Sequence, residues 1–285
     1  MMKPYAHPEV LVSTDWVSEH LNDESVAVIE VDADFEAGYG QGHVPGAIGW
    51  DLHVDLEDQV SRDIPGLSQL EGLLGRSGIG NDTTVVLYGD GNNRSATWAF
   101  WLLKYYRHGD VRLINGGRTK WTQESRPLST EVPSPAPSAY RAGVPDRSIR
   151  ATKNYVLRDL RDPSVALLDA RTSEEHKGEL AASIGTDQSG AYRKGRIPGA
   201  IHVQWDEGAG DDGTFRPVSE LAALYQSVGA TPDKEVVSYC RLGMRASYSW
   251  FILKYLLGYE RVRTYDGSWT EWGNSVGVPV ESDAG

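Results

Sequence analysis

The sequence predicts an α/β protein made of two similar domains, each a parallel sheet with helices on both faces. Short, continuously apolar runs alternate with helix-like segments along the whole chain, a pattern typical of strands that are buried on both sides. The motif order of the first half returns in the second half after about 150 residues, which indicates an internal repeat. With 285 residues and 40% hydrophobic residues, the chain can fill two cores.

The expected strands fall at corresponding places in the two halves. They are 26–31, 84–88 and 111–114 in the first half, and 165–168, 235–239 and 262–264 in the second. Helical spacing of apolar residues follows the fifth of these runs, from Ala246 to Leu257. In an open parallel sheet the ligand-binding crevice lies at the carboxyl ends of the strands. Residues that directly follow a strand are therefore the first candidates for a functional site.

The repeat also defines the predicted domains. Pro-Gly-Ala-Ile occurs at 45–48 and 198–201, each time followed by a Trp-Asp pair, and the segment 115–121 is answered by 266–272. A proline-rich stretch with few large apolar residues, 125–147, separates the halves and is expected to be an extended linker. We therefore predict domains at 1–124 and 148–285, joined by that linker.

Charge and composition narrow the partners and the compartment. Twenty-eight basic against forty acidic residues give a formal charge of −12, which argues against nucleic acid or an anionic membrane as a partner. The amino terminus lacks the pattern of a signal peptide, and no apolar run approaches the ~18 residues of a membrane helix. A single cysteine cannot form an intramolecular disulfide, so we expect a cytoplasmic protein. The seven histidines show no paired ligand spacing, and neither a metal nor a cofactor is expected.

Cys240 is the strongest candidate for a nucleophile. It directly follows the strand at 235–239 and precedes the helical segment, and Arg241 and Arg245 lie within five residues of it. Unpaired N–H groups at a helix start and nearby guanidinium groups both stabilise an anion, so a thiolate is the expected resting form. A buried structural cysteine is the alternative, but such a residue has no use for two adjacent arginines.

The first half lacks this nucleophile. When the repeats are aligned through Ala96 and Ala246, the position of Cys240 is occupied by Asp90. A carboxylate cannot form a sulfur-centred covalent intermediate, so the first domain is expected to be catalytically inactive.

These motifs resemble those of tandem-domain rhodaneses, the thiosulfate sulfurtransferases, over nearly the whole chain. The resemblance rests on the loop Cys-Arg-Leu-Gly-Met-Arg at 240–245, the two Pro-Gly-Ala-Ile motifs, Asp-Ala-Arg at 169–171 and Tyr-Asp-Gly-Ser-Trp at 265–269. It implies an enzyme that carries a sulfane sulfur as a persulfide on Cys240, between a small anionic donor such as thiosulfate and a thiophilic acceptor such as cyanide or a thiol. It also implies an inactive first domain, in agreement with the repeat.

The chemistry of the loop suits this reaction. Arg241 and Arg245 can bind the sulfonate oxygens of thiosulfate, because a planar guanidinium contacts two oxygens at once. The backbone N–H groups of Leu242, Gly243 and Met244 are expected to cradle the persulfide, with the glycine allowing the tight turn.

Three alternative functions are weighed against this one. The relatives that use 3-mercaptopyruvate resemble this fold but carry small neutral residues in the loop and an arginine at the position of Glu175. A phosphatase of the related fold needs an arginine where this chain has Ala246. A non-catalytic persulfide carrier or protein-binding module belongs to another class of function.

Further residues are candidates for supporting roles. Arg171 is expected either to contact the substrate anion or to form an ion pair with Glu174 or Glu175. Asp266 is expected to accept hydrogen bonds from the loop, and Trp269 to form a wall of the pocket. Because Glu175 stands where the resembling enzymes have an arginine, Arg193 or Lys194 are further candidates for anion binding.

Overall fold

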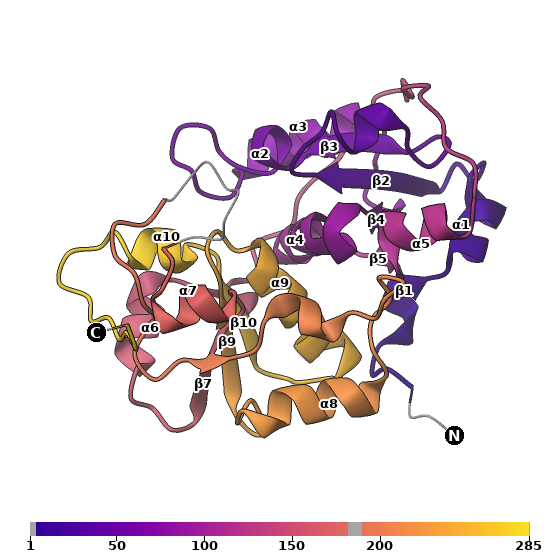
Figure 1. Ribbon diagram of the computed structural model, residues 1–285. Helices are drawn as coiled ribbons and strands as arrows, with labels where there is room; N and C mark the ends of the chain where they lie inside the picture. The colour runs from indigo at the N-terminus through magenta and orange to yellow at the C-terminus, as the bar shows by residue number, and fades with distance from the viewer. Residues whose placement is uncertain (1–3, 182–189, 285) are drawn as a thin grey trace. The chain divides into compact units, whose positions relative to one another are not determined.

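The computed structural model describes residues 4–181 and 190–284, which form two compact units (Figure 1). The amino-terminal unit comprises Glu9–Asp146 together with Ala209–Phe215, and the carboxy-terminal unit comprises the remaining described residues. The segment Ala209–Phe215 therefore joins the amino-terminal unit although it lies within the second repeat. Its Phe215 N–H donates to the Asn115 side chain (3.0 Å), and its Asp212 binds Lys120 (2.7 Å).

In the amino-terminal unit, the described residues form a five-stranded parallel sheet with the order β1-β5-β4-β2-β3. The strands are β1 (Leu11–Val12), β2 (Val26–Asp32), β3 (Ile48–Asp51), β4 (Thr84–Tyr88) and β5 (Val111–Ile114). The helices are α1 (Thr14–His20), α2 (Leu52–Asp55), α3 (Leu67–Arg76), α4 (Asp90–Tyr105) and α5 (Gly117–Gln123).

The described part of the carboxy-terminal unit repeats this topology in the order β6-β10-β9-β7-β8, again all parallel. The strands are β6 (Arg150–Ala151), β7 (Val165–Asp169), β8 (Ile201–His202), β9 (Glu235–Tyr239) and β10 (Val262–Tyr265). The helices are α6 (Lys153–Asp159), α7 (Ser173–Lys177), α8 (Val218–Ser227), α9 (Met244–Phe251), which continues as a π-helical turn to Leu256, and α10 (Ser268–Trp272).

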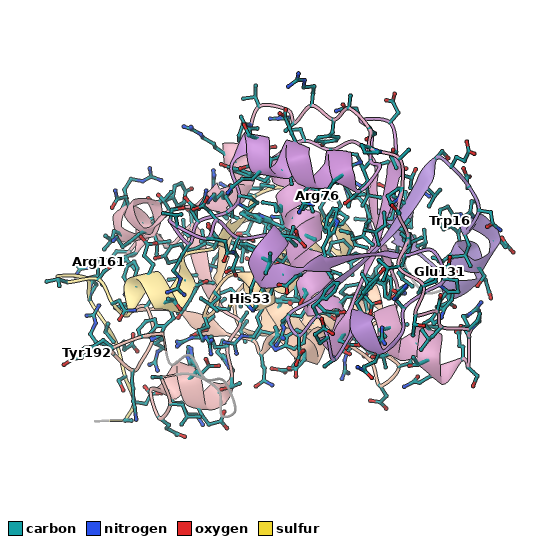
Figure 2. The ribbon with its side chains drawn as sticks, turned by 90° about the horizontal axis from the view of Figure 1, so that it is seen from above. Trp16, His53, Arg76, Glu131, Arg161 and Tyr192 are labelled. Atoms are coloured by element: carbon teal, nitrogen blue, oxygen red, sulfur yellow. The ribbon has the colours of Figure 1, made fainter. Side chains whose placement is uncertain are left out.

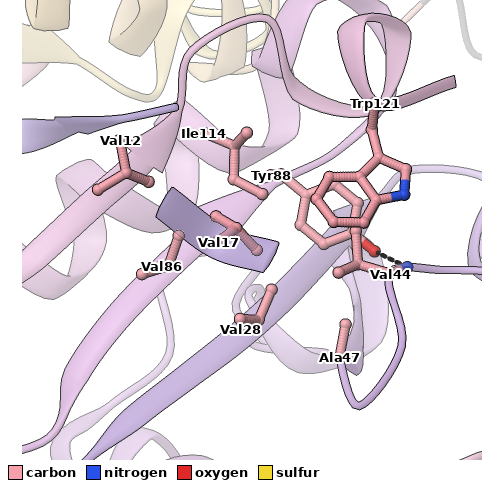
Figure 3. Packing of buried hydrophobic residues seen from close by; sticks show 9 residues of the cluster. All are labelled: Val12, Val17, Val28, Val44, Ala47, Val86, Tyr88, Ile114 and Trp121. Carbon is pink, nitrogen blue, oxygen red and sulfur yellow. Dashed lines mark hydrogen bonds between the residues drawn. The ribbon is translucent and has the colours of Figure 1, made fainter. Parts of the chain in front are cut away.

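Both faces of each sheet are covered, as predicted. In the amino-terminal unit, Val86 and Tyr88 of β4 pack with Val17 of α1 and Trp121 of α5, and the Tyr88 hydroxyl accepts a hydrogen bond from the Val44 N–H (Figure 3). Side chains alternate along a strand, which directs Val85 and Leu87 to the opposite face. Helix α4 contributes no residue to the cluster drawn in Figure 3, and it packs against β2, β4 and β5. Its counterpart α9 packs against β9 and β10.

The six predicted strands are confirmed, with ends shifted by at most one residue. In its described residues the structure adds four short strands that sequence patterns did not reveal, β1, β3, β6 and β8. Three of them, β1, β6 and β8, span only two residues, which is too few to show a periodicity. The proline-rich segment is extended, and it packs along the amino-terminal unit through backbone bonds such as Ser138 N–H to the Gly75 carbonyl (2.9 Å).

None of the helices in the described ranges has the length and apolar character that crossing a bilayer requires.

Candidate active site

Cys240 lies where β9 ends and the turn into α9 begins. Its side chain is buried, with 1% of the residue exposed, and it packs with Ala170, Ala246 and Trp205. Strand β9 is the central strand of its sheet, so Cys240 stands at the carboxyl edge, between the ends of β7 and β10. This is the position expected for a reactive group in an open parallel sheet.

The turn after Cys240 directs a backbone donor at the sulfur. The N–H of Gly243 lies 3.1 Å from the Cys240 Sγ atom, and Gly243 has a φ of 100°. A side chain at that φ is strained, so glycine is needed where the backbone turns back toward the sulfur. The structure thus brings Gly243, among the loop residues predicted from sequence, directly to the thiol.

Ser268 is a site residue that the sequence reasoning missed. Its hydroxyl accepts a hydrogen bond from the Cys240 N–H (3.0 Å), donates one to the Tyr265 carbonyl (2.7 Å), and lies 4.0 Å from the Cys240 sulfur. Its φ of 50° is uncommon for a residue with a side chain, and the aligned residue in the first repeat is Gly117, with a φ of 53°. The sequence did contain a signal for this residue: the second repeat has a serine where the first repeat has a glycine.

Arg245 is held by Glu175 of α7. The guanidinium makes two hydrogen bonds to the carboxylate, Nη1 to Oε2 at 2.7 Å and Nη2 to Oε1 at 3.0 Å. The Glu175 side chain is fully buried and that of Arg245 is 11% exposed. Burial opposes ionisation of Glu175, but the bonds from Arg245 outweigh it, so the pKa of this carboxyl lies below its usual value. Glu175 therefore stays charged, and it lies against the second arginine of the loop.

Arg241 is half-buried and directly follows Cys240 in the chain. Burial lowers the pKa of Arg241, and the neighbouring charge of Arg245 lowers it further. An arginine remains charged in spite of such a shift. Two like charges so close together favour an anion between or beside them.

Arg171 is completely buried, and its ion-pair partner is Asp169, not Glu174 or Glu175 as expected. The guanidinium donates to the Asp169 carboxylate from Nε (2.9 Å) and Nη2 (2.7 Å), and to the Gly195 carbonyl (2.8 Å). It also lies over the Trp269 ring, 4.6 Å from its centroid. The structure thus gives Arg171 a supporting position behind the loop.

The other predicted residues are also placed. The Asp266 carboxylate binds Arg150 of β6 (2.8 and 2.6 Å), and the hydroxyl contact with the Cys240 backbone comes instead from Ser268. Trp269 is buried, and its backbone N–H donates to the Cys240 carbonyl (2.9 Å), which ties α10 to the end of β9.

The two cations proposed as replacements at position 175 are anchored elsewhere. Arg193 donates to four backbone carbonyls, those of Gly273, Val278, Trp272 and Ser275. Lys194 donates to the Glu179 carbonyl. Tyr192, just before them, points outward (Figure 2) and is 93% exposed. Neither cation fills the place of the missing arginine.

The amino-terminal unit repeats the hydrogen bonds around this site but has a glycine in the place of the cysteine. Tyr88 bonds to Glu30 as Tyr239 bonds to Asp169, and the Arg118 N–H donates to the Gly89 carbonyl as the Trp269 N–H does to Cys240. These equivalences move the counterpart of Cys240 from Asp90 to Gly89. A Cβ atom at Gly89 would lie 2.3 Å from the Val31 carbonyl oxygen, so no side chain fits there.

Among the described residues, no group of three or more histidine, cysteine, aspartate or glutamate side chains is arranged to hold a metal ion.

Comparison with known families gives two matches along the chain. Residues 13–124 and 152–275 each match the model of the rhodanese-like domain. The sulfur carrier protein TtuD of Thermus thermophilus is 53% identical over 279 residues, covering 97% of this chain and 98% of the relative. A Saccharopolyspora erythraea protein named "Putative thiosulfate sulfurtransferase" is 46% identical, covering 96% of each chain.

Solved structures agree with these sequence matches. An anaerobic ergothioneine biosynthesis enzyme from Chlorobium limicola, in complex with trimethyl histidine, superposes with a TM-score of 0.89 at 26% identity, covering all of this chain and 73% of that one. A structure of EanB with ergothioneine covalently linked with a cysteine persulfide gives a TM-score of 0.86 at 27% identity, covering all of this chain and 72% of the other.

Proposed function

The chain belongs to the rhodanese-like family, with two such domains in tandem, and from this premise we propose that it is a sulfurtransferase carrying sulfane sulfur as a persulfide on Cys240. The observation that carries the proposal is the loop itself. A buried cysteine sulfur accepts a backbone N–H at 3.1 Å and lies beside two arginines at the start of a helix.

The first half-reaction loads the cysteine. The Cys240 thiolate attacks the outer sulfur of thiosulfate, a sulfur–sulfur bond forms at Cys240, and the bond within thiosulfate breaks with its electron pair leaving on sulfite. Arg241 and Arg245 stabilise the charge on the sulfonate oxygens. The Gly243 N–H, which lies against the thiol sulfur in the resting protein, stabilises the anionic sulfur.

The second half-reaction unloads it. A thiophilic acceptor, cyanide or a thiolate, attacks the outer sulfur of the persulfide, and the Cys240 thiolate leaves in its original state. The name of the Thermus relative, a sulfur carrier protein, supports a chain that carries sulfur to an acceptor. A chain that only passed sulfur between partners would use the same Cys240 persulfide.

We assign catalysis to the domain at 148–285 and an inactive role to the domain at 1–124, joined by 125–147. The crowded backbone at Gly89 supports this assignment, because the first domain has no room for a nucleophile at the equivalent place. Thiosulfate is preferred over 3-mercaptopyruvate as donor, because the loop offers two arginines where small neutral residues would suit the latter. The free thiol suits a reducing, cytoplasmic location.

A donor comparison tests the function. Thiocyanate formation from cyanide is measured with thiosulfate and with 3-mercaptopyruvate, using wild type and Cys240→Ser. We expect turnover with thiosulfate at the higher kcat/KM, and its complete loss in the variant. Turnover that survives in Cys240→Ser excludes the persulfide mechanism, and a higher kcat/KM for 3-mercaptopyruvate reverses the donor assignment.

A further inference from the structure

Resting on the function proposed above, we propose that Glu175 is a specificity-determining residue that weakens the binding of dianionic donors relative to donors with a single negative charge. The residue lies outside the loop, on α7, and its carboxylate binds Arg245 of the loop.

The charges around the sulfur support this role. Arg241 and Arg245 bring two positive charges, and Glu175 brings one negative charge that stays ionised because Arg245 holds its pKa low. The buried pair of Arg171 and Asp169 behind them is neutral as a unit. Apart from the sulfur itself, the two loop arginines and Glu175 therefore carry a net single positive charge, so a second negative charge on the donor gains about half of what the two arginines would offer without Glu175.

Hydrogen bonding points the same way. A guanidinium has five N–H groups, and Glu175 occupies one on each terminal nitrogen of Arg245. Those two form the end-on face of the guanidinium, so an incoming sulfonate is left with the remaining N–H groups of Arg245 or competes with a carboxylate already in place. The carboxylate is itself fixed, because Glu175 Oε2 also accepts the Thr172 N–H that caps α7 (3.0 Å).

The test compares two donors that share the reacting sulfur–sulfur bond but differ in charge, thiosulfate and methanethiosulfonate. In Glu175→Gln we expect the KM for thiosulfate to fall about tenfold and that for methanethiosulfonate about threefold, since halving the donor charge halves the logarithm of a Coulombic effect. The matched control is Glu174→Gln, the same charge change on an exposed neighbouring residue, for which no shift is expected.

A purely structural role gives the opposite result. If Glu175 only positions Arg245, then Glu175→Gln raises the KM for both donors by the same factor, and the proposal is overturned. The circular dichroism spectrum and thermal midpoint of each variant show whether it is folded.

A second measurement needs neither the variant nor any turnover. Sulfate and methanesulfonate are compared as protectants of Cys240 against iodoacetamide in the wild type, by intact mass, since the chain has one cysteine. We expect the two anions to protect at concentrations within about threefold of each other. Sulfate protecting more than about tenfold better would overturn the proposal. If the two anions protect Cys240 as expected but neither donor transfers sulfur to it, the proposed sulfurtransferase function is wrong. The inference about the charge of the site then still holds.

Discussion

The backbone N–H of Gly243 and the sulfur of Cys240 lie 3.1 Å apart, a hydrogen-bond distance for a sulfur acceptor. The contact exists because the chain turns through a left-handed residue immediately before α9 begins. A thiol, a thiolate and a persulfide anion can each be placed against such a donor, and the negatively charged forms gain most from it.

Gly243→Ala tests this contact. An L-residue in the left-handed region costs about 1–2 kcal/mol, so the turn is expected to relax and move the N–H from the sulfur. We expect kcat/KM for thiosulfate to fall about tenfold or more. The control is Gly277→Ala, at an exposed glycine with a φ of 79° and open space around its Cβ position, which carries a similar backbone cost. Equal kcat/KM in the two variants would mean that the Gly243 contact has no role.

Ser268 offers a pair of substitutions that separate its hydroxyl from its backbone strain. Both Ser268→Ala and Ser268→Gly leave the buried Cys240 N–H without its side-chain acceptor, and we expect kcat/KM to fall about tenfold in each. Only the glycine relieves the cost of a positive φ, so it is expected to be more stable than the alanine by about 1 kcal/mol in urea unfolding. Wild-type activity in both variants would assign the hydroxyl a purely local role.

The two loop arginines are expected to differ when removed. Arg241→Ala should raise the KM for thiosulfate by about ten- to a hundredfold with little loss of stability, as for a charge-assisted hydrogen bond. Arg245→Ala leaves Glu175 buried without its partner and should cost about 3–5 kcal/mol of stability. Adding Glu175→Gln to Arg245→Ala should restore much of it. Similar unfolding curves for both single variants would contradict the buried ion pair.

Glu30 of the amino-terminal unit gives a pH prediction. Burial and the nearby Asp32 raise the pKa of this carboxyl to about 8, although Arg118 and Tyr88 oppose the shift. Because the folded-state pKa lies above the unfolded value of about 4.3, the protonated form favours folding. This contribution is complete below the unfolded pKa and is lost as the pH rises toward 8.

The measurement is the thermal midpoint of wild type and Glu30→Gln at pH 5 and pH 8.5. We expect similar midpoints at pH 5 and a more stable variant at pH 8.5. A variant that is less stable by the same amount at both pH values would mean that Glu30 is ionised throughout.

Much of the fold followed from local patterns, and so did the choice of Cys240 as the candidate nucleophile. Strands β4 and β9 are short runs with two adjacent valines that end in a tyrosine, and the expected helix after Cys240 is present as α9 and its π-helical turn. The short strands at 150–151 and 201–202 had no pattern of their own, since they are defined by pairing with distant strands.

The partner of Arg245 could not be predicted, because it depends on which strand ends meet. Arg171 binds Asp169 two residues before it, on its own strand end, whereas Arg245 reaches Glu175, seventy residues earlier in the chain. The counterpart of Cys240 was misplaced by one residue, since the stretch from the end of β4 to Ala96 is one residue longer than the stretch from the end of β9 to Ala246, and alignment through Ala96 cannot show where the extra residue lies.

The central claim is that Cys240 carries the sulfur, and intact-mass measurement after brief treatment with thiosulfate tests it most directly. The account predicts a mass gain of one sulfur atom, lost on addition of cyanide and absent in Cys240→Ser. An unchanged mass in the folded wild type, or the same gain in Cys240→Ser, would contradict it.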